Sequence, residues 1–103
     1  MKFRIDYSTE TEDHFLALTA GERTLVLDRV DSVLTVCADV PSRNRKLLRA
    51  NWLAPWELRV GDLRVFYDID YDAEHGPVVL VRAIGKKVRN NYCIGGERVD
   101  LEL

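Results

Sequence analysis

Residues 55–70, PWELRVGDLRVFYDID, constrain the fold of this chain most strongly. Apolar and polar residues alternate on both sides of Gly61-Asp62, a pattern typical of two half-buried strands joined by a two-residue turn with glycine first. The apolar face of this hairpin comprises Trp56, Leu58, Val60, Leu63, Val65, Tyr67 and Ile69, and the opposite face comprises Glu57, Arg59, Arg64, Phe66 and Asp68. In this register Arg59 lies directly opposite Arg64, and like charges in direct opposition destabilise a sheet.

The flanking segments predict the remaining elements. Residues 2–7 alternate like a strand, and residues 77–84 have the continuous apolar character of a central strand. Between these two strands, a capping box at Thr9 and Glu12 predicts a short helix, and a break at Ala20-Gly21 precedes a longer helix over residues 22–38. A basic connection spans residues 41–54, and the chain ends with residues 92–94 and an edge strand at 98–103.

This element order predicts an α+β fold, with two N-terminal helices packed on one face of a mainly antiparallel sheet of four or five strands. The apolar stripe of the longer helix comprises Val26, Val30, Val33, Leu34 and Cys37. The apolar hairpin face meets the helices in this arrangement, so the face with Arg59 and Arg64 is expected to be open to water. We expect Trp52 and Trp56 to be core anchors, because tryptophan is highly buried on average.

Composition indicates a single globular domain over residues 1–103, with 47% hydrophobic and 31% charged residues. The sequence has no apolar run of about 18 residues and no signal-peptide core, so we expect a cytoplasmic protein without a membrane segment. Cys37 and Cys93 are expected to be reduced, and neither has a second ligand at metal spacing. No metal or cofactor is therefore expected.

The charges are segregated along the chain. Six bases stand against two acids from residue 43 to 64, and four bases stand with no acid from residue 82 to 89. Because the net charge of the chain is −2, the remaining residues carry −10. This segregation of basic and acidic residues favours an anionic partner over a uniformly solvated surface.

Two fixed guanidinium groups on an exposed sheet suit phosphate oxygens, and they can stabilise the charge that develops in phosphoryl transfer. An equally strong alternative is a surface cluster in which Glu57, two residues from Arg59 and diagonal to Arg64, neutralises both arginines. The residues alone leave both interpretations open.

Three segments, NRKLLR at 44–49, WELRVGDLRVFYDID at 56–70 and VVLVRAIGKKVRNNYCIGGERVDL at 78–101, resemble the RelE/ParE superfamily of toxins from bacterial type II toxin–antitoxin modules. The resemblance implies two helices on a curved antiparallel sheet. It implies either a metal-independent mRNA endonuclease that acts on the ribosome (an mRNA interferase that inhibits translation) or a ParE-like poison of DNA gyrase. A decayed toxin that only binds its antitoxin and represses the operon is a third alternative. In each case the partner is a cognate antitoxin from the same operon.

The resemblance also implies roles for individual residues. Arg64 matches the arginine that contacts the scissile phosphate in RelE-like toxins, and Arg59 and Lys87 match two further basic positions of the catalytic site. The expected RNA contacts are Arg45, Lys46, Arg49, Phe66, Lys86 and Arg89. The departures concern the proton-transfer groups: Glu57 stands where RelE has a second lysine, and Cys93 stands where RelE has a tyrosine. Tyr92 comes one residue early and is expected to face the other side of the sheet.

Overall fold

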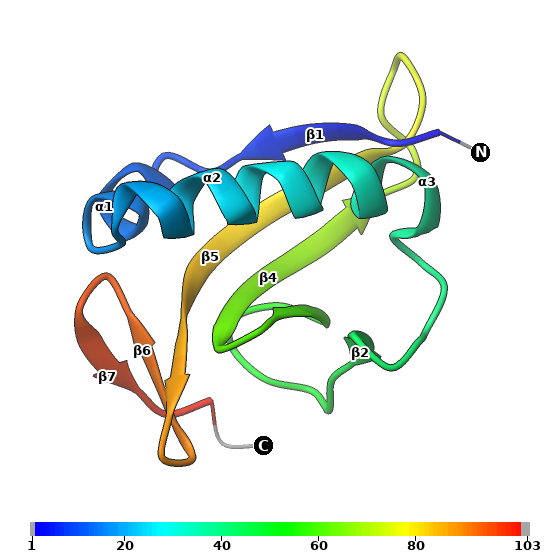
Figure 1. Cartoon of the computed structure of the whole chain (residues 1–103). Coiled ribbons are helices and arrows are strands. Elements are labelled where there is room, and N and C mark those ends of the chain that lie inside the picture. Colours follow the sequence, from blue (N-terminus) through cyan, green and yellow to red (C-terminus); the bar gives the residue numbers. More distant parts are fainter. Residues whose placement is uncertain (1, 102–103) are drawn as a thin grey trace.

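The computed structural model of the chain describes residues 2–101 (Figure 1). Its helical elements are α1 (Thr11–Leu16), α2 (Ala20–Arg29), the π-helical turn η1 (Val30–Leu34) and α3 (Thr35–Cys37). Its strands are β1 (Arg4–Tyr7), β2 (Arg45–Leu47), β3 (Trp56–Val60), β4 (Leu63–Asp70), β5 (Val78–Val88), β6 (Asn91–Ile94) and β7 (Glu97–Val99). None of the helices in residues 2–101 combines the length and the apolarity needed to cross a membrane.

The strands form one sheet in the order β2-β3-β4-β5-β6-β7, in which every neighbouring pair is antiparallel. Strand β1 lies off this path and pairs in parallel with the first half of β5. The predicted α+β class and mainly antiparallel sheet are confirmed. The predicted four or five strands are too few, since the described residues form seven. The helices follow β1, the strand predicted at residues 2–7, so they are not strictly N-terminal.

Two strands differ from the prediction. Strand β2 lies inside the segment predicted as a connection, because three residues are too few to show alternation. The terminal strand predicted over residues 98–103 is the shorter β7, and residues 102 and 103 lie outside the described part of the chain.

The capping box lies at the second helix instead of the first. The side chain of Thr19 accepts a hydrogen bond from the backbone N–H of Glu22, and the Glu22 carboxylate accepts one from the backbone N–H of Thr19. Helix α2 therefore begins at Ala20, and the break between the helices precedes Ala20-Gly21. Helix α1 begins after Glu10 with no side-chain cap, so the box predicted at Thr9 and Glu12 is wrong. Both segments share the T-x-x-E pattern, and sequence spacing does not distinguish them.

The π-helical turn η1 shifts the apolar stripe of the long helical segment. A π turn inserts one extra residue into the helix. Eleven residues make three turns of a regular α-helix, which would place Cys37 in line with Val26. With one residue inserted, Ala38 takes that place and is fully buried, whereas Cys37 is only partly buried. The predicted packing of Cys37 in the stripe is therefore wrong by one residue.

The helices cover one face of the sheet, where the larger hydrophobic cluster lies (Figure 1). All seven residues predicted for the apolar hairpin face belong to this cluster or pack against it. The ring of Trp56 stacks on that of Tyr67 with centroids 6.0 Å apart, so its predicted role as a core anchor is confirmed. The Tyr67 hydroxyl donates a 2.7 Å hydrogen bond to the carbonyl of Ala38, which joins the hairpin to the end of the helical segment.

A second, smaller hydrophobic cluster covers part of the face that the helices leave bare. Its buried members are Ala54, Phe66, Ala83, Ile94 and Leu101. The loop before β3 and strand β7 contribute to it through Leu53 and Val99. The prediction that this face is open to water is therefore wrong, because hydrophobic residues outside the hairpin cover its centre. Trp52 is 62% exposed, so its predicted role as a core anchor is also wrong.

Candidate functional site

The hairpin places two arginines directly opposite each other on the face of the sheet away from the helices. Gly61 has φ of +60°, which a glycine adopts without strain at the first position of the turn. The register pairs Arg59 with Arg64 and Val60 with Leu63, as predicted. Because Val60 and Leu63 belong to the helix-facing core, the two arginines lie on the opposite face.

Arg64 is buried, which corrects the expectation of two exposed guanidinium groups. Its side chain is 10% exposed, and its Nη1 donates hydrogen bonds to the carbonyls of Gly61 and Leu63 at 2.7 and 2.9 Å. The side chain of Arg59 is 40% exposed. Of the two arginines, Arg59 is therefore the one accessible to an outside anion, and Arg64 fixes the turn.

Glu57 offsets the repulsion between the two arginines. Its side chain is 2% exposed, and its Oε1 lies 2.8 Å from Nε of Arg64 and 3.8 Å from Nε of Arg59. Among the described residues these three atoms are buried and form no hydrogen bond of good geometry. Coulomb attraction therefore holds the cluster together, which agrees with the neutralising role considered for Glu57, although the cluster is buried instead of lying at the surface.

Tyr92 lies on the arginine face, and Cys93 does not. The turn at Arg89 and Asn90, both with positive φ, aligns Tyr92 with Lys87 and Cys93 with Lys86. The Tyr92 ring packs edge-on against Phe66 with centroids 5.4 Å apart. The expectation that Tyr92 faces away from the arginines is therefore wrong, because it assumed that the functional tyrosine position was that of Cys93.

The environment of Tyr92 keeps its hydroxyl protonated. Burial raises its pKa, and the charge of Glu57 raises it further, while Arg64 and Arg59 act in the opposite direction. Phe66, against which the Tyr92 ring packs, is aligned with Glu57 in the β3–β4 register, so the phenol lies on the same part of the face as the charged cluster. A protonated phenol beside two guanidinium groups is a hydrogen-bond donor and a source of a proton.

The two adjacent lysines lie on opposite faces of β5. The Nζ atom of Lys87 lies 5.5 Å from the centre of the Tyr92 ring, on the arginine face. The Nζ atom of Lys86 lies 2.8 Å from Oε2 of Glu22 on helix α2. Lys87 is therefore part of the arginine–tyrosine site, whereas Lys86, predicted as an RNA contact, is on the helical side.

The other predicted RNA contacts are divided between buried and exposed positions. Phe66 is fully buried, so it cannot stack on a base as predicted. Arg45 is aligned with Leu58 of the helix-facing core, and its Nε donates a 2.8 Å hydrogen bond to the carbonyl of Val40. Lys46 is exposed and aligned with Glu57, which places it on the arginine face.

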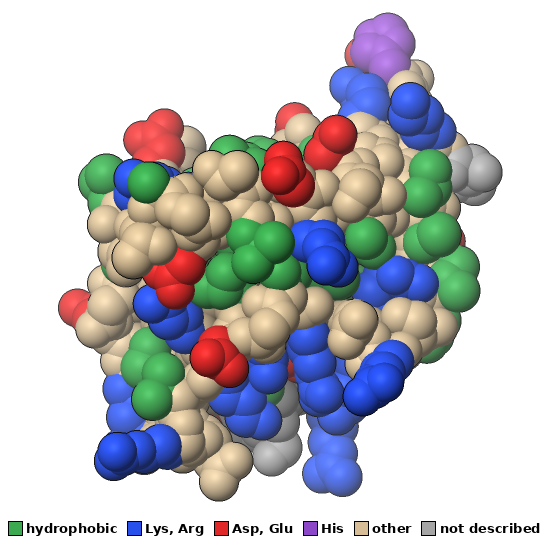
Figure 2. Space-filling model, in the orientation of Figure 1, with side chains coloured by type: hydrophobic (Ala, Val, Ile, Leu, Met, Phe, Trp, Pro, Cys, Tyr) green, Lys and Arg blue, Asp and Glu red, His purple; other side chains and the backbone are tan. Residues whose placement is uncertain are grey.

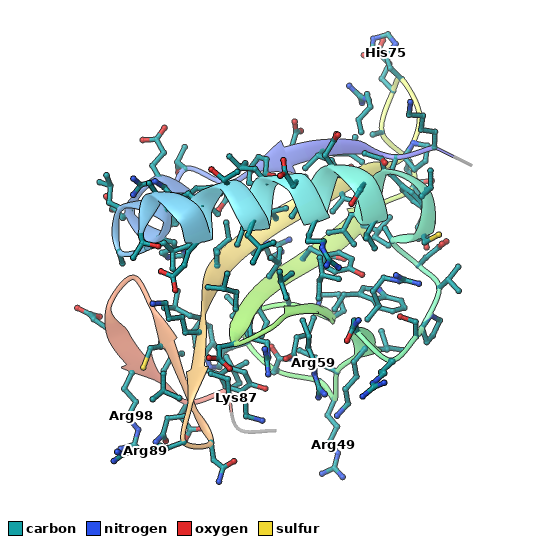
Figure 3. The ribbon with its side chains drawn as sticks, in the orientation of Figure 1. Arg49, Arg59, His75, Lys87, Arg89 and Arg98 are labelled. Atoms are coloured by element: carbon teal, nitrogen blue, oxygen red, sulfur yellow. The ribbon has the colours of Figure 1, made fainter. Side chains whose placement is uncertain are left out.

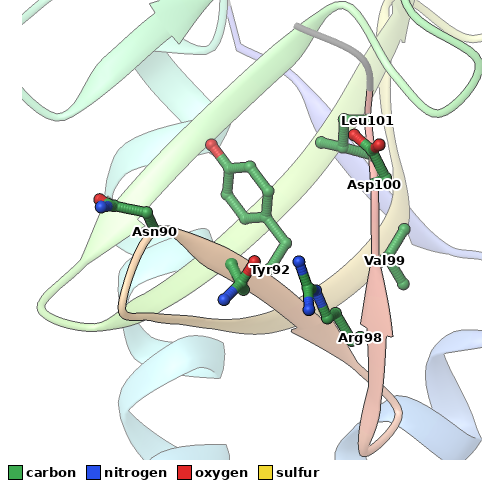
Figure 4. A pocket seen from close by; sticks show the side chains of 7 residues that line it. Asn90, Tyr92, Arg98, Val99, Asp100 and Leu101 are labelled. Carbon is green, nitrogen blue, oxygen red and sulfur yellow. The ribbon is translucent and has the colours of Figure 1, made fainter.

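Exposed cations lie on the same side of the molecule as the site, although Arg98 is aligned with Cys93 and not with Tyr92. Figure 3 shows Arg49, Arg59, Lys87, Arg89 and Arg98 on the side of the molecule away from the helices, and Figure 2 shows Lys and Arg side chains gathered along the same side. Arg98 was not among the predicted site residues, since it was assigned only to an edge strand. It lines a pocket of about 270 Å³ together with Tyr92 and Asn90 (Figure 4).

The two histidines lie outside the arginine site. His14 is on α1, and its Nδ1 accepts a 3.3 Å hydrogen bond from the backbone N–H of Ile84. His75 lies in the exposed loop between β4 and β5 (Figure 3). Within residues 2–101, no three His, Cys, Asp or Glu side chains are grouped so that they would hold a metal ion.

The site thus combines one accessible arginine, a lysine, a protonated tyrosine and a buried Glu57–Arg64 pair on a single sheet face. Its accessible cations can bind a phosphate group. No model of a known protein family matches the chain, and no curated protein matches it.

Proposed function

We propose that this chain is the toxin of a type II toxin–antitoxin module of the RelE/ParE superfamily, acting in the cytoplasm as a metal-independent mRNA endonuclease on the ribosome. The observation that carries the proposal is the grouping of Arg59, Lys87 and Tyr92 around the Glu57–Arg64 pair on the helix-free face. The motifs that resemble this superfamily supply most of these residues.

The proposed reaction is an attack of a ribose 2′-hydroxyl on the adjacent phosphorus. The bond from phosphorus to the 5′-oxygen breaks, which leaves a 2′,3′-cyclic phosphate and a 5′-hydroxyl. Arg59 and Lys87 bind the phosphate oxygens and stabilise the charge that develops on them. Tyr92 gives its proton to the leaving 5′-oxygen, and the proton of the 2′-hydroxyl passes to solvent water, because the Glu57 carboxylate is buried against Arg64.

Arg64 has a positioning role in this scheme. It holds the Glu57 carboxylate at 2.8 Å and anchors the hairpin turn through two carbonyls. Because removing Arg64 leaves a buried carboxylate without its closest partner, the Arg64→Ala variant is expected to fold poorly. Variants of the exposed residues therefore test the chemistry more cleanly.

Inducible expression of the chain without an antitoxin tests the proposal. We expect growth arrest and new transcript 5′ ends with the wild-type chain, and neither with Arg59→Ala or Lys87→Ala. Lys86→Ala is the matched control, since Lys86 is an adjacent lysine on the opposite face. Growth arrest with intact transcripts would refute the endonuclease, and full cleavage by the Arg59→Ala and Lys87→Ala variants would refute the site assigned to it.

A ParE-like poison of DNA gyrase is the second candidate. It is favoured by the burial of Arg64, because the residue that matches the phosphate-contacting arginine is already bound to Glu57. This candidate predicts inhibition of gyrase supercoiling and broken DNA with intact transcripts. Supercoiling assays run in parallel with transcript mapping distinguish the two candidates.

For either activity we propose a cognate antitoxin encoded in the same operon as the partner. The exposed cations on the helix-free side would attract an acidic segment that folds on contact. Co-expression of a neighbouring short reading frame should restore growth and retain the tagged toxin.

A further inference from the structure

An exposed tryptophan stands apart from the arginine site. Trp52 is 62% exposed, although tryptophan is usually among the most buried residues. Its Nε1 donates a 2.9 Å hydrogen bond to the carbonyl of Asp100. The only polar atom of the indole is therefore satisfied within the protein, and the exposed part of the ring can interact mainly through its apolar face.

The loop that carries Trp52 is fixed by its own hydrogen bonds. The Asn51 side chain accepts hydrogen bonds from the backbone N–H groups of Leu53 and Ala54 at 2.8 and 3.0 Å. It also donates to the carbonyls of Arg49 and Ala54, each at 2.8 Å. Leu53 packs against the smaller hydrophobic cluster. The indole ring is thus already held in place, so little conformational entropy is lost when a ligand binds to it.

We infer that Trp52 is a stacking platform for a base of single-stranded RNA, with Arg49 and Arg82 receiving the adjacent phosphates. The inference rests on the proposed endonuclease, whose substrate it extends beyond the reacting phosphate. An aromatic face with nearby guanidinium groups is the usual combination in proteins that bind single strands.

Charge decides which side of Trp52 receives the nucleotide. Trp52, Leu53 and Arg82 line two hollows, of about 400 and 430 Å³. The first also contains Arg49 and Asp68, so its charged residues sum to +1. The second instead contains Glu10 and Glu97, which with Arg82 sum to −1 when His14 is neutral. The nucleotide therefore belongs in the first hollow.

The ion pair between Arg82 and Asp68 in this hollow is weak, so a phosphate group can displace it. Nη2 of Arg82 lies 3.4 Å from Oδ2 of Asp68, and both side chains are more than a third exposed. Exposed ion pairs of this kind contribute little to stability. A phosphate can therefore replace the carboxylate, or share the guanidinium with it.

The hollow also lies in line with the arginine site. Arg49 follows β2 in the chain, Lys46 of β2 is aligned with Glu57 of β3, and Arg59 lies two residues further along β3. Figure 3 shows Arg49 and Arg59 on the same side of the molecule. One strand of RNA would follow these cations from the reacting phosphate to Trp52.

Binding of an eight-nucleotide 2′-O-methyl RNA to the purified chain at low salt tests the inference without any need for cleavage. In fluorescence anisotropy we expect roughly 5- to 150-fold weaker binding for Trp52→Ala and near wild-type binding for Trp52→Phe. Leu47→Ala is the control for the loss of an exposed apolar side chain, since Leu47 is 57% exposed on the neighbouring strand. In a Trp56→Phe background, emission from Trp52 should be quenched as RNA is added.

The outcomes separate this inference from the proposed function. Unchanged RNA affinity of Trp52→Ala, with Arg59→Ala weakened, would overturn the stacking platform and leave the endonuclease standing. Quenching of Trp52 without transcript cleavage in cells would support the platform and refute the endonuclease. If Trp52→Ala loses only a protein partner while RNA affinity is unchanged, the platform is likewise overturned.

Discussion

Replacing Glu57 with glutamine would remove the negative charge that lies between two arginines. The Arg64 side chain is 10% exposed and that of Glu57 2% exposed, so the remaining guanidinium would be buried without its counter-charge. Breaking a buried pair from one side costs about 3–5 kcal/mol. Because Nη1 of Arg64 retains two backbone acceptors, we expect the lower end, a loss of about 3 kcal/mol in the free energy of unfolding. In urea this lowers the midpoint by about 1–3 M.

A double-mutant cycle shows whether the loss comes from the charge pair. Glu57→Leu with Arg64→Met removes both charges, and the double variant should recover much of the stability that each single variant loses. Asp68→Asn is the control, because it breaks an exposed ion pair with Arg82 and should cost below about 1 kcal/mol. A Glu57→Gln variant as stable as Asp68→Asn, with additive effects in the cycle, would refute the account of the buried cluster.

Three further predictions concern β5 and its neighbours. Gly85→Ala should destabilise the fold by about 1–3 kcal/mol in urea unfolding, since its Cβ would overlap the carbonyl oxygen of Cys93. Burial lowers the pKa of His14, whose neutral ring accepts the hydrogen bond from Ile84, so stability should fall as the pH drops from 7 to 5, by at most about 1.4 kcal/mol per pH unit. Tyr92→Phe should reduce transcript cleavage about 10²- to 10⁴-fold while thermal unfolding is little changed.

Each of these has a control in the same chain. Gly21→Ala meets no atom within 4 Å of the new Cβ and lies in α2, so it should stabilise the protein by about 0.5–1 kcal/mol. The pH dependence should become shallower in His14→Ala and stay unchanged in His75→Ala, and an unaltered slope in His14→Ala would count against the hydrogen bond to Ile84. Undiminished cleavage by Tyr92→Phe would exclude the phenol as the proton donor.

Apolar and polar residues alternate over enough of the hairpin to predict its register, its turn and its apolar face from the sequence. The pairing of Arg59 with Arg64 follows from that register, because the two positions are equally distant from Gly61-Asp62. The α+β class follows from the element order for the same reason: each long element has its own periodicity. These are local properties, and the structure confirms them.

The errors concern contacts between distant parts of the chain. The burial of Phe66 depends on Leu53, Ile94 and Leu101, which reach the hairpin from segments with no periodicity of their own. The orientation of Tyr92 depends on the turn at 89–90, where two non-glycine residues adopt positive φ. The sequence pattern does not show such a turn, because Arg-Asn is not a typical pair for it.

Strand β5 contributes side chains to both hydrophobic clusters: Val79, Val81 and Ile84 to the larger, and Ala83 to the smaller. The two hydrophobic clusters, one on each face of the sheet, therefore depend on the same strand. Heating should melt the helical layer and the basic face in one cooperative transition, with near-identical midpoints from helix circular dichroism and from Trp52 emission in a Trp56→Phe variant. A substitution among the eleven residues of β5 would then affect both faces of the sheet at once.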